Sequence, residues 1–93
     1  MPDAPGTLSA LGLSQAALGD NAGAYASWSR ALALDPHQYE TLFNLAMLSG
    51  RMGKTEEARK ALERFVAAAP KDRYAEQLAQ AKMALKSLGP GPK

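Results

Sequence analysis

The apolar residues of this chain recur at spacings of three and four positions, which is the period of an amphipathic α-helix. Breaks that contain glycine or proline divide this pattern into five segments. The only β-branched residues are three threonines and one valine, which argues against a sheet. We therefore predict an all-α protein with helices over five ranges, about Thr7–Leu18, Ala22–Leu34, Gln38–Met52, Thr55–Ala69 and Asp72–Leu88.

The first four segments form two similar units, which lie 34 residues apart in the sequence. Gly19 and Gly53 stand in the turn inside each unit, where glycine suits the left-handed residue that ends a helix. Pro36 and Pro70 follow the second helix of each unit and stop it. Each unit is therefore predicted to be a helix-turn-helix hairpin. The candidate N-caps of the two second helices are Asp20 or Asn21, and Thr55.

The positions within each unit resemble the tetratricopeptide repeat, whose 34-residue motif is Trp-x2-Leu-Gly-x2-Tyr, then Ala-x3-Phe, then Pro. The corresponding residues of the first unit are Leu8, Leu11, Gly12, Gln15, Ala24, Trp28 and Pro36. Those of the second unit are Leu42, Leu45, Ala46, Ser49, Ala58, Leu62 and Pro70. Both units lack the aromatic residues of the first helix, and bulky Phe65 stands where the family prefers a small residue. The resemblance implies an α-solenoid of two antiparallel helix-turn-helix repeats plus a capping helix, wound as a right-handed superhelix.

The same resemblance implies a single domain over residues 1–93. Its parts are repeat one over 5–38, repeat two over 39–72, a capping helix over 73–88 and a disordered tail over 89–93. Pro2 lies 34 residues before Pro36, so the segment from Pro2 to Ala4 looks like the end of a preceding unit. We therefore expect the chain to be the C-terminal end of a longer array, although an N-terminal proline is common enough for coincidence.

The closing helix carries an apolar stripe, made of Tyr74, Leu78, Ala81, Leu85 and Leu88. Two orientations of this stripe are open. In the first, the stripe packs on the second helix of repeat two, which gives the solenoid a polar outer end. In the second, it faces the groove of the solenoid and enlarges an apolar binding patch.

The resemblance also implies a function, which is that of a non-catalytic module for binding other proteins. The first helix of each hairpin lines the concave face of such a solenoid, so we expect a peptide or a helix to bind in an apolar groove there. The groove residues that we predict are Leu13, Phe43, Asn44, Met47, Arg51 and Leu78. The alternative is a structural role, as a cap of a larger multidomain protein or as a surface for self-association into a homodimer.

Asn44 alone matches the residues with which some family members clamp a C-terminal carboxylate, so we expect it to bond the backbone between units instead. We assign Trp28 and Phe65 to the core. Three further residues are expected in the core, and to be less exposed than Leu13, Phe43 and Met47, namely Leu11, Leu45 and Ala58.

The composition gives little support for a catalytic or a metal-binding function. The chain has no cysteine and only one histidine, His37, so we expect no catalytic, cofactor or metal site. The net charge is +2, divided as −3 over residues 1–50 and +5 over residues 51–93. We expect the cations of the fourth segment to form a solvated surface, namely Lys54, Arg59, Lys60 and Arg64.

No apolar stretch approaches the roughly 20 residues of a membrane span, and the N-terminus does not resemble a signal peptide. We therefore expect protein or peptide partners, with neither nucleic acid nor membrane among them, and the compartment stays open.

Overall fold

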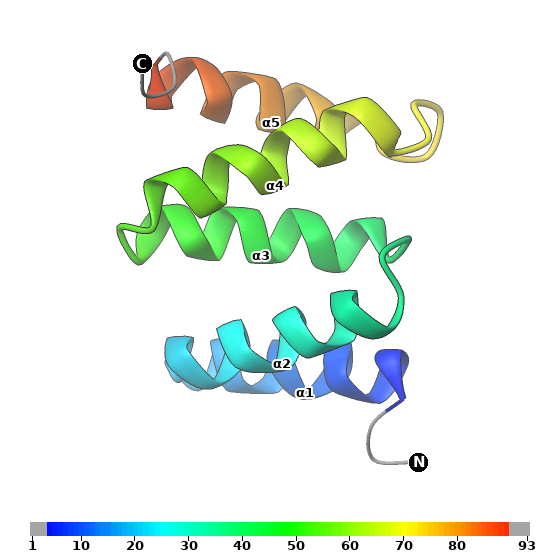
Figure 1. Ribbon diagram of the computed structural model, residues 1–93, viewed down its shortest axis with the longest axis vertical. Coiled ribbons are helices and arrows are strands. Elements are labelled where there is room, and N and C mark those ends of the chain that lie inside the picture. The colour runs from blue at the N-terminus through cyan, green and yellow to red at the C-terminus, as the bar shows by residue number, and fades with distance from the viewer. Residues whose placement is uncertain (1–3, 90–93) are drawn as a thin grey trace.

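The computed structural model describes residues 4–89 of the chain as five α-helices joined by short turns. These helices are α1 (Pro5–Ala17), α2 (Asn21–Leu34), α3 (Tyr39–Arg51), α4 (Thr55–Ala68) and α5 (Ala75–Leu88). They stack in chain order, with α1 and α2 as one hairpin, α3 and α4 as the next, and α5 against α4 (Figure 1). No strand occurs between residues 4 and 89, and the predicted α-solenoid is confirmed. The predictions for Pro2, Asp3 and the tail over 90–93 lie outside the described residues.

The turn inside each hairpin has the conformation that the repeat predicts. Gly19 and Gly53 adopt φ angles of +84° and +80°, where a residue with a Cβ atom is strained. The Asp20 side chain accepts a hydrogen bond from the Gly23 N–H at 2.9 Å, which caps α2. Thr55 was wrongly predicted to cap α4: it is the first helical residue, because the 34-residue register pairs Asp20 with Lys54.

The closing helix begins three residues later than predicted. Residues 71–73 form a turn, and the Tyr74 N–H donates to the Pro70 carbonyl oxygen at 3.1 Å. This turn brings the Tyr74 ring edge-on to the Phe65 ring, with 5.8 Å between the ring centroids. The contact between the Tyr74 and Phe65 rings therefore forms at the position where the sequence predicted the first turn of the closing helix.

The predicted core residues Trp28 and Phe65 are both buried, which confirms their assignment. Trp28 lies across Gly12 and donates a hydrogen bond from its indole N–H to the Ser9 carbonyl oxygen at 3.1 Å. A Cβ atom on Gly12 would approach three atoms of the indole ring closer than 3.0 Å. The missing side chain of Gly12 therefore lets α1 and α2 pack tightly around the indole.

The main core cluster joins α2, α3, α4 and α5. Its buried members are Leu32, Leu42, Ala46, Leu62, Phe65, Ala69, Leu78 and Ala81. Tyr74, Leu85 and Leu88 pack against the same cluster, so the whole stripe of the closing helix faces the core. The first of the two predicted orientations is therefore the one that the structure adopts.

Leu11 was wrongly assigned to the core. Its side chain is 47% exposed, whereas its counterpart Leu45, 34 residues later, is half-buried. The physical reason is that Leu45 packs against the preceding hairpin, at Ala24 and Trp28. Leu11 occupies the same register on α1, where no preceding hairpin is present in the described part of the chain.

Candidate functional site

Four of the six predicted groove residues lie on α3, and they differ in how accessible they are. Arg51 is exposed, while Asn44 and Met47 are half-buried. Phe43 is also half-buried, because its ring packs on Phe65 with 5.3 Å between the centroids. Part of the Phe43 ring therefore belongs to the core.

The remaining two predicted residues lie on α1 and α5. Leu13 is 55% exposed, and α1 contributes no side chain to the pocket in which Met47 and Arg51 meet. Leu78 is only 7% exposed and belongs to the main core cluster, because the closing helix turns its apolar stripe inward. Leu13 therefore lies on a separate surface, and Leu78 is not accessible from the pocket.

A pocket of about 350 Å³ opens between α3, α4 and the last turns of α5. Met47 and Arg51 line it from the α3 side, so two of the predicted groove residues are brought together here. Its other lining residues are Ala46, Gly50, Ala58, Leu62, Ala84, Ser87 and Leu88. The lining is mostly apolar, and we call this cavity the α3–α5 pocket.

Small residues create the α3–α5 pocket, and those on α5 are the lining residues that the sequence analysis missed. Gly50 on α3 and Ala84 and Ser87 on α5 leave the space that larger side chains would fill. The available signal was the small residues of the closing helix, Ala84 and Ser87, which are followed by the apolar Leu88. That signal can be interpreted only when the orientation of α5 is known, and the sequence left this orientation open.

Arg59 connects α4 to the C-terminal end of α5, although it was predicted to lie on a solvated surface. The residue is only 9% exposed. Its Nη1 donates to the Gly89 carbonyl oxygen at 2.6 Å, and its Nε donates to the Glu56 carboxylate at 3.3 Å. The guanidinium therefore ties the C-terminus of α5 to α4, beside Leu88.

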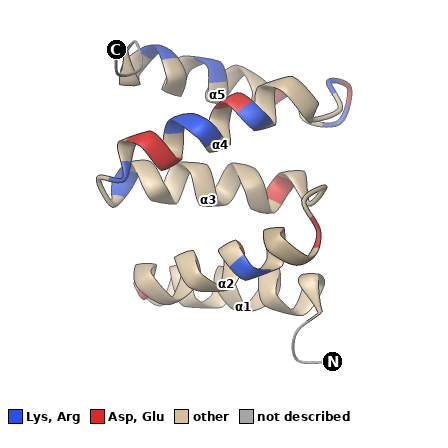
Figure 2. Cartoon of the chain, in the orientation of Figure 1, with Lys and Arg blue, Asp and Glu red and all other residues tan. Residues whose placement is uncertain are grey.

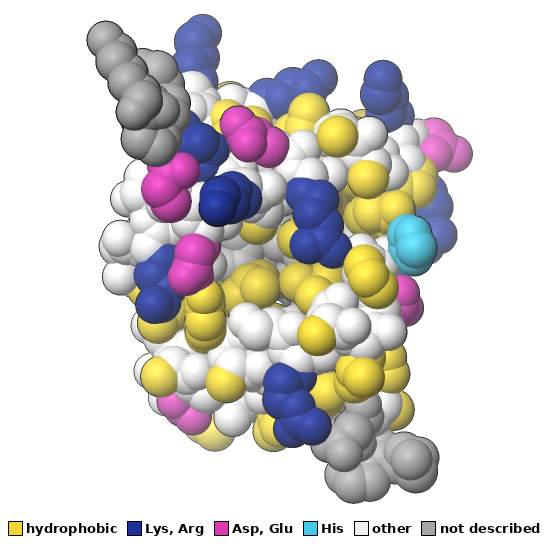
Figure 3. Space-filling model, viewed as in Figure 1, with side chains coloured by type: hydrophobic (Ala, Val, Ile, Leu, Met, Phe, Trp, Pro, Cys, Tyr) yellow, Lys and Arg dark blue, Asp and Glu magenta, His cyan; other side chains and the backbone are white. Residues whose placement is uncertain are grey.

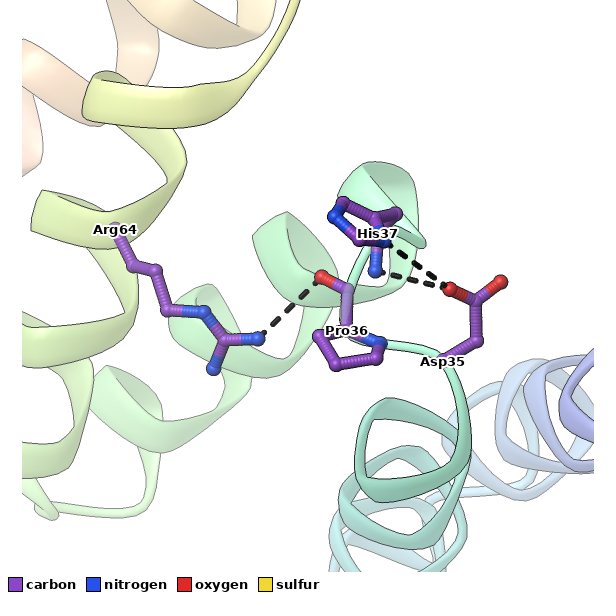
Figure 4. Close-up of polar contacts among 4 residues, drawn as sticks. All are labelled: Asp35, Pro36, His37 and Arg64. Carbon is purple, nitrogen blue, oxygen red and sulfur yellow. Dashed lines mark hydrogen bonds and ion pairs between the residues drawn. The ribbon is translucent and has the colours of Figure 1, made fainter.

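The Asn44 side chain makes no hydrogen bond with any residue from 4 to 89, so its predicted bond to the backbone between units is absent there. His37 lies exposed in the turn between α2 and α3 (Figure 4). Its backbone N–H donates to the Asp35 carboxylate at 3.0 Å, and its Nδ1 lies 3.8 Å from the same oxygen. These contacts hold the turn.

Charge is distributed unevenly over the helices (Figure 2). Between residues 4 and 19 there is no Lys, Arg, Asp or Glu, so α1 is uncharged along its length, whereas α4 carries both signs. The Tyr25 hydroxyl donates to the Glu57 carboxylate, which links α2 to α4. This hydrogen bond, with smaller contributions from burial and the negative charge, raises the pKa of Tyr25 above its ordinary value.

Comparison with known proteins agrees with this geometry. A family model described as tetratricopeptide repeat matches residues 19–86, which is more than two thirds of the chain. No curated protein matches the chain. Among the helices within residues 4–89, none is both long and apolar enough to cross a membrane.

Proposed function

The chain belongs to the tetratricopeptide repeat family, and we propose that it binds an apolar side chain of a partner protein in the α3–α5 pocket. Members of this family are generally non-catalytic scaffolds for protein–protein interaction. The observation that carries the proposal is the pocket itself, because it unites Met47 and Arg51 with an apolar lining.

The size and lining of the pocket favour one anchoring side chain. Its volume of about 350 Å³ is at the lower end of the roughly 300–1,000 Å³ found for ligand sites. Met47 is flexible and polarizable, which suits a surface that adjusts to the side chain it receives. Arg51 is exposed at the rim, where its guanidinium is available to a carboxylate beside the anchor. The partner segment is therefore a helix or an extended peptide with an apolar residue next to an acidic one.

A pocket-filling variant tests this proposal. Ser87 is exposed and lines the pocket, so Ser87→Trp should fill it with little effect on the core. Ser14→Trp is the matched control, since Ser14 is exposed on α1 and lies outside the pocket. Binding is measured by fluorescence anisotropy with 12-residue peptides selected against the chain from a random library. We expect Ser87→Trp to weaken binding at least tenfold and Ser14→Trp less than twofold. Equal binding by the Ser87→Trp variant and the parent would disprove the proposal.

A second candidate function is structural, and the outer face of α1 favours it. On α3 and its C-cap, the face against the preceding hairpin is formed by Thr41, Leu45, Leu48 and Met52, all of them buried or half-buried. The residues in the same register on α1 and its C-cap are Thr7, Leu11, Ser14 and Leu18, all of them exposed. Leu18 is 86% exposed at the end of a helix without charge, which is unusual for a surface that stays in water.

In this second function, the chain caps a longer array. The exposed face of α1 packs against the second helix of a preceding hairpin, and the side chains of that helix are small and aromatic like those of α2. A duplicate of residues 5–38 placed before residue 5 supplies such a helix. We expect this fusion to have a melting temperature well above that of the parent. The pair Leu11→Glu with Leu18→Glu, placed in the fusion, should abolish this gain, and placed in the parent it should leave the melting temperature unchanged. No gain in melting temperature would exclude stacking on α1. A parent chain whose mass doubles with concentration by light scattering would assign the face to a homodimer instead.

A further inference from the structure

A second hollow opens on another face of the molecule, between α2 and α4. In Figure 3 apolar side chains form the floor of this hollow, and charged side chains lie along its upper edge. The hollow has a volume of about 380 Å³. Its lining residues are Ser29, Leu32, Ala33, Leu42, Leu45, Glu57, Lys60, Ala61 and Arg64. We call it the α2–α4 groove; α4 uses different residues here from those that line the α3–α5 pocket.

The shape of the α2–α4 groove follows from unequal walls. The α2 wall presents the short side chains of Ser29 and Ala33, which cannot reach α4. Leu32 and Leu42 of the main core cluster lie buried beneath the floor, and the half-buried side chains of Leu45 and Ala61 form its more accessible part. An apolar floor beneath a channel walled by short side chains is suited to a side chain from another protein, because water there gains few hydrogen bonds.

The α4 wall is cationic at the groove. Lys60 and Arg64 are four residues apart on one face of α4, where like charges repel one another slightly. Within residues 4–89, neither of them forms an ion pair with a carboxylate. Arg64 instead donates from Nη2 to the Pro36 carbonyl oxygen at 3.3 Å, so its guanidinium reaches toward the turn between α2 and α3 (Figure 4).

The two acidic residues in the first turn of α4 are already engaged. Glu57 lines the groove but accepts the hydrogen bond of the Tyr25 hydroxyl. Glu56 is held by the Arg59 guanidinium. Lys60 and Arg64 therefore retain N–H donors for an external acceptor, and the charge offered to a ligand at the groove is positive.

From this combination we propose that the α2–α4 groove binds an acidic amphipathic segment of a partner protein. An apolar side chain of the segment packs on Leu45 and Ala61, and its flanking carboxylates bond Lys60 and Arg64. A nucleic acid is the less suitable occupant, because the lining holds no aromatic side chain for a base to stack on. This site is independent of the α3–α5 pocket, so either proposal can fail without the other.

The test uses two labelled 12-residue peptides, each with a pair of leucines three positions apart, flanked by glutamates in one peptide and by lysines in the other. A labelled single-stranded oligonucleotide is the third probe. We expect the full chain to bind the glutamate peptide at least tenfold more tightly than either other probe, with a dissociation constant that rises with salt. Backbone amide shifts should concentrate at Ser29, Ala33 and Ala61.

Two kinds of variant then test the site itself. Lys60→Glu with Arg64→Glu should weaken binding of the glutamate peptide at least tenfold. Lys71→Glu with Lys82→Glu changes the net charge equally at exposed positions outside the groove and should change binding less than threefold. Ala33→Trp fills the channel at an exposed position without altering charge, and should abolish binding while the helical circular dichroism spectrum persists. Equal binding of the two peptides, tighter binding of the oligonucleotide, or amide shifts at Met47 and Ser87 would each overturn the proposal.

Discussion

Replacement of Gly12 by alanine tests how α1 and α2 are packed, because alanine normally stabilises a helix. In this structure the added Cβ atom would approach Nε1, Cδ1 and Cε2 of Trp28 closer than 3.0 Å. The indole cannot withdraw freely, since its N–H is bonded to the Ser9 carbonyl and the ring lies against buried Ala24 and Leu48. We therefore expect Gly12→Ala to destabilise the module although its helix propensity improves.

The magnitude follows from three terms. Overpacking a tightly packed site costs about 1–3 kcal/mol. Weakening the indole hydrogen bond to Ser9 costs about 1 kcal/mol more. Replacing a glycine inside a helix by alanine stabilises the helix by about 1 kcal/mol. The net loss is about 1–3 kcal/mol, and each kcal/mol lowers the melting temperature of a domain this size by roughly 4–8 °C.

Gly6→Ala is the matched control, because Gly6 lies on the same helix with no atom within 4 Å of an added Cβ. This variant should be equal to the parent or more stable by up to about 1 kcal/mol. Stability is measured by urea unfolding, followed by circular dichroism and by the fluorescence of Trp28, the one tryptophan. In a Trp28→Leu background the cost of Gly12→Ala should shrink, since the clash is removed. A Gly12→Ala variant that is as stable as Gly6→Ala would refute the packing described here.

Three further substitutions have definite expected outcomes. Phe43→Ala should lower the free energy of unfolding by about 1–3 kcal/mol in urea titrations, because a half-buried ring leaves the core cluster; an unchanged midpoint contradicts this. Arg59→Met should speed hydrogen exchange of the last α5 amides, since the bond to the Gly89 carbonyl is lost; unchanged exchange rates contradict it. The pKa of Tyr25 is raised in the folded state by Glu57, so the stability from this contact is present below about pH 10 and is lost as the pH rises through the raised pKa. Tyr25→Phe should be free of that alkaline loss in thermal melts, and parallel melting curves of the two proteins would show that the contact does not form.

The repeating part of the fold could be predicted from the sequence because its signals are local. Gly19 and Gly53 adopt the left-handed conformation that only glycine enters without strain, and they recur at the 34-residue offset together with Pro36 and Pro70. The burial of Trp28 follows from its place in the same register. Helix boundaries inside the hairpins are therefore close to their predicted positions.

The errors concern residues whose surroundings depend on neighbouring helices. Leu11 and Leu45 are the same residue type in the same register, and only the presence of a preceding hairpin makes one of them half-buried. Arg59 turns inward because α5 ends with the Gly89 carbonyl beside it, which a list of cations on α4 cannot reveal. Leu78 was placed in the groove because the rotation of a lone closing helix is decided by packing.

The candidate site was predicted in part for the same reason. Met47 and Arg51 share a helix face by spacing alone, and the structure brings both to one pocket. The opposite wall comes from Ala84 and Ser87, and their position depends on how α5 packs on α4.

The most direct test of the proposed function is an intermolecular nuclear Overhauser experiment on the full chain with a library-selected peptide. If the α3–α5 pocket is the binding site, the anchoring apolar side chain of the peptide should show contacts to the Met47 methyl group, the Ala84 methyl group and the Leu88 side chain. A peptide that binds with contacts only to the α2–α4 groove or to the outer face of α1 would contradict the proposal.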